Sequence, residues 1–309
     1  MTDHARSPTF EESIELEEIV KDRFRSEHKP WQWPWAPGAP GSVLLSMAAA
    51  AAYRTVPDDV AITSLHAQFG ANVVTDKPIV YRVQRVRDGG YLKTRKVVIE
   101  QDSCEMVWFT IGFVRMTPWK GPAIKHSSQQ VGLQPLRKIE LDEFRHFFGR
   151  RANRPRMEFQ RLPLITEASI SSSVQPVVGR IIDALEAPAG SAVHVVGLMS
   201  LTDCMFSSAP HALHDVKLVL PPIGDTTSGP QIPDTTSLMT LDHTVHIHSH
   251  DFRADELLYF EMDSPWAANG RAFVRSRIFK EDGTFIASCS QEVLTVFKPD
   301  AKLEKNAKL

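Results

Sequence analysis

The feature that most constrains the fold is an internal repetition, in which an apolar helix and a set of extended segments occur twice along the chain. Residues 40–57 are rich in Ala, Leu and Met, start after Pro-Gly with Ser42 as the expected helix cap, and end before Pro57. Residues 189–206 have the same apolar character in the second half. Each predicted helix is followed by four predicted strands, at 64–69, 77–90, 91–101 and 104–116 in the first half and at 238–252, 254–266, 270–283 and 284–297 in the second.

The two sets of strands match one another in sequence as well as in order. The segment "KPIVYRV" corresponds to "DELLYFE", and "KTRKVVI" to "GRAFVRS", at an offset of about 180 residues, which indicates a tandem duplication. The expected fold class is α+β, with two tandem repeats that each wrap a helix in an antiparallel β-sheet. Residues 156–162 are expected to open the second repeat as a strand, whereas residues 13–25 fit either a helix or a strand. The predicted division is an N-terminal repeat at 8–124, a linker at 125–152, a C-terminal repeat at 153–300 and a tail at 301–309.

Composition excludes several classes of protein. The chain has 309 residues, of which 42% are hydrophobic, and this is enough for a large core. With 35 basic and 37 acidic residues the net charge is -2, so neither nucleic acid nor an anionic membrane is an expected partner. No run approaches the ~18–20 apolar residues of a membrane span, and the acidic N-terminus lacks the apolar core of a secretion signal. The three cysteines form no CxxC motif, which favours a reducing compartment.

The last three residues indicate a location. Ala307, Lys308 and Leu309 form a tripeptide close to the Ser-Lys-Leu peroxisomal signal. We therefore expect peroxisomal localisation, with the import receptor as a partner that reads the free C-terminal tail. The alternative is a cytoplasmic protein whose lysine-rich tail matches the signal by chance.

The segment "LDHTVHIHSHDF" at 241–252 contains four histidines and raises the question of a metal site. The alternation with a period of two predicts a strand instead, with Thr240 and Asp242 on one face and His243 and Val245 on the other. Two histidines at i and i+2 bind a transition metal only with further ligands, and the surrounding residues supply no complete set. No metal is expected.

Several segments, in their order and spacing, resemble one family. They are "SLHAQF" followed by "KPIVYRVQRVRDGG", then "RPRMEF", "VHVVGLMSLTD", "TLDHTVHIH", "GRAFVRSRIFKEDGTFIAS" and "SQE". On these segments the chain, from about Glu15 to Phe297, resembles the acyl-CoA thioesterases of the type II, TesB-like family. The resemblance implies a double hot-dog fold, hydrolysis of an acyl-CoA to a free acid and CoA, and no cofactor.

The resemblance also implies which residues of the C-terminal repeat hold the hydrolytic water. They are Asp203 of "LTDC", Thr240 of "TLDH" and Gln291 of "SQEV". A carboxylate within hydrogen-bonding reach takes the proton of the water, so Asp203 is the expected general base, while Thr240 and Gln291 orient the water. His66 and His243 match histidines of the family and are secondary candidates for the site.

The chain departs from the family pattern before the first helix. The family usually has a Phe-Gly-Gly-Gln stretch there, where this chain has Pro40, Gly41 and Ser42. We therefore expect the acyl-chain specificity, and to a lesser extent the rate, to differ from the family pattern.

Two alternative functions remain open. One is a hot-dog dehydratase or hydratase, which needs an acid and a histidine facing the substrate together, whereas Asp242 and His243 are strand neighbours on opposite faces. The other is a non-catalytic protein that binds acyl thioesters in a specialised acyl or polyketide pathway. The free strand edges of each repeat are compatible with a homo-oligomer.

Overall fold

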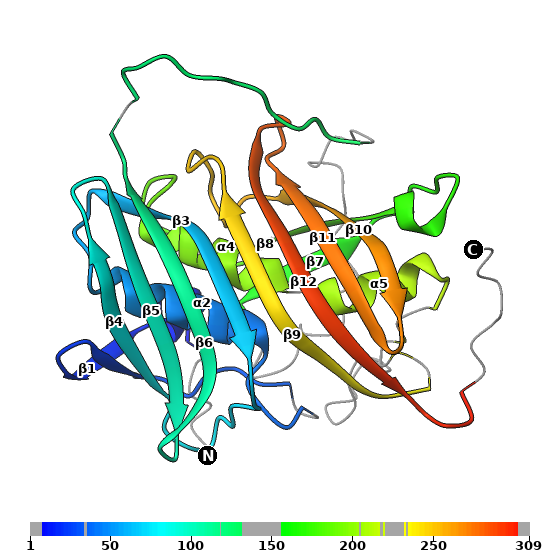
Figure 1. The fold of residues 1–309 in the computed structure, drawn as a ribbon, viewed down its shortest axis with the longest axis horizontal. Coiled ribbons are helices and arrows are strands. Elements are labelled where there is room, and N and C mark those ends of the chain that lie inside the picture. The colour runs from blue at the N-terminus through cyan, green and yellow to red at the C-terminus, as the bar shows by residue number, and fades with distance from the viewer. Residues whose placement is uncertain are drawn as a thin grey trace, which may run out of the picture.

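Twelve antiparallel strands from both repeats form one sheet that curves around two buried helices (Figure 1). The computed structural model describes residues 8–33, 36–117, 119–131, 156–203, 205–216, 219, 232 and 234–301. Residues 132–152 of the predicted linker and the predicted signal at 307–309 lie outside the described residues.

The elements follow the predicted repetition. The first repeat contains α1 (Phe10–Ser13), β1 (Leu16–Val20), β2 (Arg23–Ser26), α2 (Gly41–Tyr53), β3 (Val60–Phe69), β4 (Val80–Asp88), β5 (Leu92–Gln101) and β6 (Cys104–Arg115). The second contains β7 (Met157–Arg161), η2 (Ile170–Ser172), β8 (Val174–Ile181), α4 (Ala192–Asp203), η3 (Phe206–Ser208), α5 (Ala209–Leu213), β9 (Thr235–Ile247), β10 (Leu258–Ala268), β11 (Arg271–Phe279) and β12 (Phe285–Phe297). Both expected helices, the two sets of four expected strands and the expected opening strand at 156–162 are present, and the ambiguous segment at 13–25 is mainly strand.

The strand β8 was not expected from the sequence. It lies between β7 and β10 in the sheet, and its residue Pro176 pairs with Glu261 of β10. A proline cannot donate a hydrogen bond to a neighbouring strand, so its presence argues against an interior strand when only the sequence is read.

The sheet order shows how the repeats join. It runs β1-β2-β4-β5-β6-β3-β9-β12-β11-β10-β8-β7, so the second repeat continues the first with the strand order reversed. The junction is the antiparallel pair β3 and β9, in which Leu65 faces Val245. This arrangement is the double hot-dog that the resemblance implied, with the two sheets fused edge to edge.

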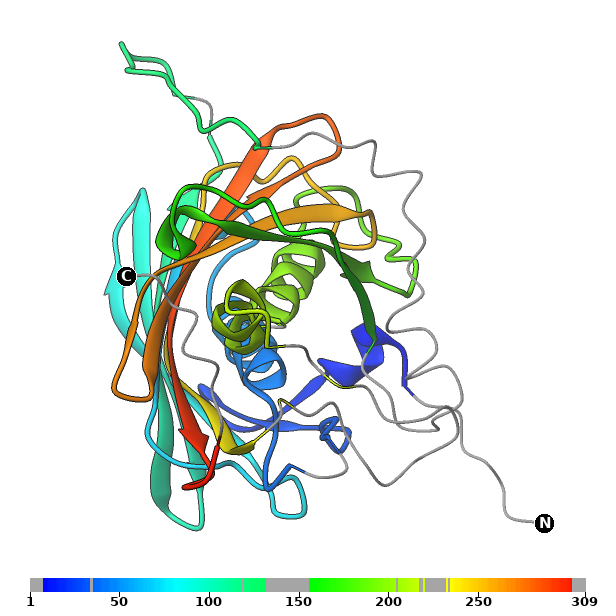
Figure 2. The same ribbon diagram turned by 90° about the vertical axis from the view of Figure 1, so that its right-hand side faces the viewer.

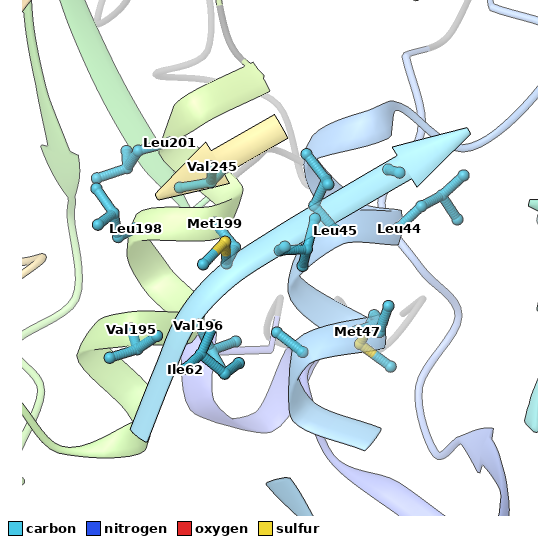
Figure 3. Packing of buried hydrophobic residues seen from close by; sticks show 14 of the residues in the cluster. Leu44, Leu45, Met47, Ile62, Val195, Val196, Leu198, Met199, Leu201 and Val245 are labelled. Carbon is cyan, nitrogen blue, oxygen red and sulfur yellow. The ribbon is translucent and has the colours of Figure 1, made fainter. Parts of the chain in front are cut away.

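The helices α2 and α4 lie side by side inside the curve of the sheet (Figure 2). Figure 3 shows Leu45 and Met47 of α2 and Met199 of α4 within the same buried cluster, close to the central strand β3. Burial of each such side chain stabilises the fold by about 1.5–3 kcal/mol. At Gly197 of α4, an added Cβ would lie 2.8 Å from the Cβ of Ala254, so glycine permits this close packing.

The apolar stretch from Ala192 to Leu213 is longer than expected from the sequence. Its length and hydropathy match those of a membrane span, but 71% of its most apolar 18-residue window is buried within this fold. Packing against the sheet and α2 therefore accounts for its composition.

Candidate active site

A bulge in the paired strands β9 and β12 decides which side chains face the helices. Glu292 pairs with Asp242, but the next residue of β12, Val293, pairs with Thr240, so β9 has one extra residue here. The extra residue shifts the alternation, and Thr240 and His243 therefore point to the same inner face of the sheet. The expectation that these two residues occupy opposite faces is wrong because of this bulge.

Asp203 is the last residue of α4, and its carboxylate lies against the first turn of α2. The backbone N–H of Ser42 donates a hydrogen bond to Asp203 Oδ2 at 2.8 Å. The N-cap residue of α2 is Pro40, which makes no side-chain cap. Ser42 is therefore not the cap expected from the sequence, because a carboxylate from the other repeat satisfies this N–H. The positive end of the α2 dipole also stabilises the ionised carboxylate.

Gly41 permits this close approach of the carboxylate to α2. A Cβ atom added at Gly41 would lie 2.9 Å from Asp203 Oδ2 and 3.0 Å from Asp203 Cγ, which is too close for ordinary packing. The segment from Pro40 to Ser42, in which the chain departs from the family pattern, thus contacts the predicted general base. A side chain at position 41 would displace Asp203.

Thr240 and Gln291 approach Asp203 from the sheet. The hydroxyl of Thr240 donates to Asp203 Oδ1 at 3.3 Å, and Gln291 Nε2 donates to Thr240 Oγ1 at 2.7 Å. Gln291 is fully buried. The three residues named by the resemblance therefore come from α4, β9 and β12 and form one hydrogen-bonded cluster, while their catalytic roles remain predictions.

Two further side chains extend this cluster into the core. His243 Nδ1 lies 2.8 Å from Gln291 Oε1, and His243 Nε2 lies 3.0 Å from Thr202 Oγ1. Phe206 packs edge-on against the imidazole, with ring centroids 5.5 Å apart. His243 was a secondary candidate, whereas Thr202 was missed. The only signal for Thr202 in the sequence is its position beside Asp203, since its partner lies on a distant strand.

Burial sets the protonation of the cluster. It raises the pKa of Asp203 above the ordinary value of 3.8, while the nearby imidazole and the hydrogen bonds to the carboxylate oppose this rise. Burial also lowers the pKa of His243 below the ordinary value of 6.5, against the opposing effect of the Asp203 charge. At neutral pH an uncharged imidazole therefore lies near a carboxylate that binds protons more readily than an exposed one. A general base benefits from such a raised proton affinity.

His66 lies on the other face of the sheet. It pairs with Thr244, whereas its neighbour Ala67 pairs with the inward-facing His243, so the side chain of His66 points outward. His66 Nδ1 lies 3.3 Å from Thr244 Oγ1, and its ring contacts that of His246 with centroids 5.3 Å apart. The structure does not bring His66 to the buried cluster.

The other histidines at 241–252 have separate partners. His248 Nε2 lies 2.9 Å from Ser288 Oγ, and His250 Nε2 lies 2.8 Å from the carbonyl oxygen of Ile62. Most of this segment forms β9, as the alternation predicted. Among the residues that the structure describes, no group of three or more His, Cys, Asp or Glu side chains is placed to hold a metal ion.

A crevice lies beside α2, close to the cluster. It is lined by Val43 and Ser200, of which Val43 follows Ser42 and Ser200 precedes Asp203 by about one helical turn. Most of its other lining is apolar and includes Phe10, Ile14, Trp31, Met47, Met157 and Ile181. An apolar crevice at this place is suited to an alkyl group next to the carboxylate.

Both repeats build this crevice, because α1 is tied to the second repeat. The backbone N–H of Phe10 donates to Asp183 Oδ2 at 2.7 Å, and Arg156 Nε donates to the same oxygen at 2.7 Å. The ion pair of Arg156 and Asp183 lies within the second repeat, and the hydrogen bond from Phe10 to Asp183 holds the N-terminal segment of the first repeat next to β7 and β8.

Both halves of the chain match models of one protein family. The model described as the acyl-CoA thioesterase N-terminal domain matches residues 29–116, and the model described as the acyl-CoA thioesterase C-terminal domain matches residues 145–295. The curated relatives include acyl-coenzyme A thioesterase 8 from Mus musculus, which is 24% identical over 311 residues, with 97% of this chain and 92% of the relative covered. The protein of the same name from Homo sapiens is 23% identical over 300 residues, with 94% and 90% covered.

Solved structures show the same fold. The acyl-CoA thioesterase II TesB2 from Mycobacterium marinum matches with a TM-score of 0.74 at 23% identity, covering 95% of this chain and 100% of the other. The tesB protein from Mycobacterium avium subsp. paratuberculosis matches with a TM-score of 0.67 at 17% identity, covering 93% and 98%.

Proposed function

Because the chain belongs to the acyl-CoA thioesterase family, whose two domain models match both of its halves, we propose that it cleaves its thioester with a water held by Asp203, Thr240 and Gln291. The protein is an acyl-CoA thioesterase, which releases a free acid and CoA. The observation that carries the proposed mechanism is the convergence of these three side chains at the N-terminus of α2.

Asp203 is proposed to take the proton of the water. Its oxygens accept hydrogen bonds from the backbone N–H of Ser42 and the side chains of Thr240 and Gln291, and a carboxylate has a further lone pair with which to accept a water. Thr240 and Gln291 fix the orientation of the carboxylate, and the amide nitrogen of Gln291 is proposed to turn toward the water oxygen as well as toward Thr240 and Asp203. The water oxygen then bonds to the acyl carbon as its proton passes to Asp203.

The thioester oxygen gains negative charge in this step, and the positive end of the α2 dipole lies beside the site. When the bond between the acyl carbon and sulfur breaks, the departing thiolate takes the proton from Asp203. The carboxylate is thereby restored, and the proposed reaction needs neither a metal ion nor a redox group.

The acyl group is proposed to lie in the crevice beside α2. The support is its mostly apolar lining and the presence in its wall of Val43 and Ser200, which lie on α2 and α4 within one helical turn of Ser42 and Asp203. Trp31→Ala removes a large wall and is expected to lower kcat/KM for long-chain acyl-CoAs by about tenfold or more, with little effect on acetyl-CoA. Trp119→Ala is the matched control, because Trp119 is 69% exposed and does not line the crevice. Equal effects of Trp31→Ala on long and short substrates would place the acyl group elsewhere.

The dehydratase or hydratase alternative has less support from this geometry. Asp203 and His243 lie in one cluster, but both ring nitrogens of His243 are occupied by Gln291 and Thr202. No imidazole nitrogen is therefore left to face a substrate. Release of free thiol from a panel of saturated and unsaturated acyl-CoAs tests this choice: we expect thiol release, whereas hydration of the unsaturated substrates without thiol release would favour the alternative.

The proposed location is the peroxisome, with Ala307, Lys308 and Leu309 as the signal that the import receptor reads. Deletion of the three residues is expected to move an N-terminally tagged protein to the cytosol without change in its kinetic constants. An unchanged distribution would favour the cytoplasmic alternative.

A further inference from the structure

The hydrogen bonds of the cluster are consecutive, so the direction of each one determines which atom donates in the next. Thr240 has a single hydroxyl proton, and Asp203 Oδ1, 3.3 Å away, accepts it. The oxygen of Thr240 must then accept at its other contact, the 2.7 Å hydrogen bond from Gln291 Nε2. The amide nitrogen of Gln291 therefore faces Thr240, and its oxygen faces away from Asp203.

This orientation determines the proton on His243. Gln291 Oε1 can only accept, so His243 Nδ1, 2.8 Å away, carries the proton between them. In the uncharged ring, Nε2 then has a lone pair and accepts from the Thr202 hydroxyl at 3.0 Å. The same hydroxyl also lies 2.9 Å from the carbonyl oxygen of Met199. In a charged ring it would donate to Met199 instead, and His243 Nδ1 would still donate to Gln291.

We propose that His243, held by Thr202, is a positioning residue that keeps the nitrogen of the Gln291 amide turned toward Thr240 and the water. The inference rests on the proposed function of Gln291 and deepens it. Asp203, Thr240 and Gln291 touch the water, whereas His243 and Thr202 act only through the orientation of the amide.

A reversed amide would harm the site. Gln291 Oε1 would then face the oxygen of Thr240, and the hydroxyl proton of Thr240 would be drawn from Asp203 to the amide. The reversed amide would also turn its N–H groups away from Thr240, Asp203 and the proposed water. Both changes remove hydrogen bonds from the water and the carboxylate, and lost positioning of this kind is costly for catalysis.

The fold does not itself require an imidazole at this point. Apart from its two hydrogen bonds, the imidazole packs against the apolar ring of Phe206. The equivalent position of the first repeat is Leu65, which is fully buried. A leucine is thus compatible with this place in the repeat.

The test replaces His243 by two residues of similar bulk but different chemistry. His243→Leu removes the donor, whereas His243→Asn keeps an N–H near the place of Nδ1. We expect His243→Leu to lower kcat by about tenfold, with KM changed less than about twofold, and His243→Asn to recover most of the loss. Thr202→Val should give a smaller loss in kcat than His243→Leu, and Thr202→Ser should retain activity. Melting temperatures identify any variant that fails to fold.

A double-mutant cycle decides whether the effect passes through Gln291. If it does, His243→Leu costs nothing further once Gln291→Ala is present. Losses that multiply, an inactive His243→Asn that folds normally, or a fully active His243→Leu would each overturn the inference. A fully active Gln291→Ala would instead overturn the proposed function, so the two failures are distinguishable.

Discussion

Each repeat contains a bulged pair of strands, but the side chains at matching positions are polar in the second repeat and apolar in the first. The first repeat has a bulge in β3, where Ser64 pairs with Gly112 but Ile62 pairs with Phe113, just as the second has one in β9. Counted from the bulge, Ile62 takes the place of Thr240. By the same count, Leu65 takes the place of His243 and Ile111 takes the place of Gln291.

The ends of the two helices differ in the same way. Tyr53 is the last residue of α2, whereas Asp203 is the last residue of α4. The hydroxyl of Tyr53 accepts a hydrogen bond from the backbone N–H of Ile62 at 3.1 Å. Its ring also packs against Phe113, with centroids 5.4 Å apart. Ile62 is fully buried. The scaffold is thus complete with apolar residues at these positions, and the polar cluster of the second repeat is better explained by function than by folding.

The comparison also shows what the first repeat contributes to the site. It provides the N-terminus of α2, with Gly41 and the N–H of Ser42 against Asp203. The first repeat provides the helix end, and the second provides the side chains that we propose to be catalytic. The proposed active site therefore requires both repeats in one chain.

The largest effect is expected for Asp203→Asn, which makes the second repeat as unreactive as the first. The amide retains the shape but has no basic lone pair for the proton of the water, so kcat should fall by about 10²–10⁴, with little change in KM. Steady-state thiol release measures this effect.

The same substitution is expected to stabilise the protein at neutral pH. The folded pKa of Asp203 is raised by burial, so the folded state binds the proton more tightly than the unfolded state. The wild type therefore loses stability as pH rises from the unfolded value of 3.8 through the folded pKa, and Asp203→Asn does not. Denaturant unfolding at several pH values should show the advantage of the variant growing with pH in that window. Lower stability of Asp203→Asn at neutral pH would contradict this.

Thr240→Val and Gln291→Ala should have intermediate effects, because these side chains position the water and do not take its proton. Each is expected to lower kcat by about ten- to a hundredfold, and the losses should combine less than additively with Asp203→Asn. Thr240→Ser is the matched control, since it keeps the hydroxyl. Equal activity of Thr240→Val and Thr240→Ser would show that the hydroxyl group is not needed for catalysis.

Gly41→Ala tests the contribution of the first repeat. The added methyl would approach Asp203 Oδ2 to 2.9 Å and push the carboxylate from its place. Kinetic measurement should show a fall in kcat of about tenfold, because a small displacement of a catalytic group is costly. Gly90→Ala is the control, since an added Cβ there meets no atom within 4 Å. A Gly41→Ala variant with full activity would mean that α2 need not contact Asp203.

The smallest effect on activity is expected from substitutions in the first repeat at the positions equivalent to the polar cluster. Ile111→Gln places an amide where Ile111 is now fully buried. The unpaired polar group should cost about 1–3 kcal/mol of unfolding free energy, while kcat stays unchanged. Ile111→Val, the control, should cost about 0.5–1.5 kcal/mol. A large fall in kcat for Ile111→Gln, at a temperature where the protein is folded, would show that the first repeat contributes side chains to catalysis.

Local composition was enough to predict the helices and most strands, but not the contacts between the repeats. The cap of α2 could not be predicted because its partner, Asp203, lies 161 residues away from Ser42. The face of Thr240 was predicted incorrectly because a bulge has no signature in the alternation of polar and apolar residues. Asp203, Thr240 and Gln291 were predicted as site residues only from the resemblance, since singly each is an ordinary residue of a helix end or a strand, and the structure brings the three together. Thr202 has no such motif role and emerged only from the hydrogen bonds.

The most direct test of the account is the dependence of kcat/KM on pH. If Asp203 is the general base, activity should fall on acidification with an apparent pKa above 3.8, because burial raises the pKa of the free enzyme's carboxyl group. Thr240→Val, which removes a hydrogen bond that lowers this pKa, should move the acid limb to higher pH. The residual activity of Asp203→Asn should lack the limb. An acid limb that keeps its position in Thr240→Val and persists in Asp203→Asn would show that another group takes the proton.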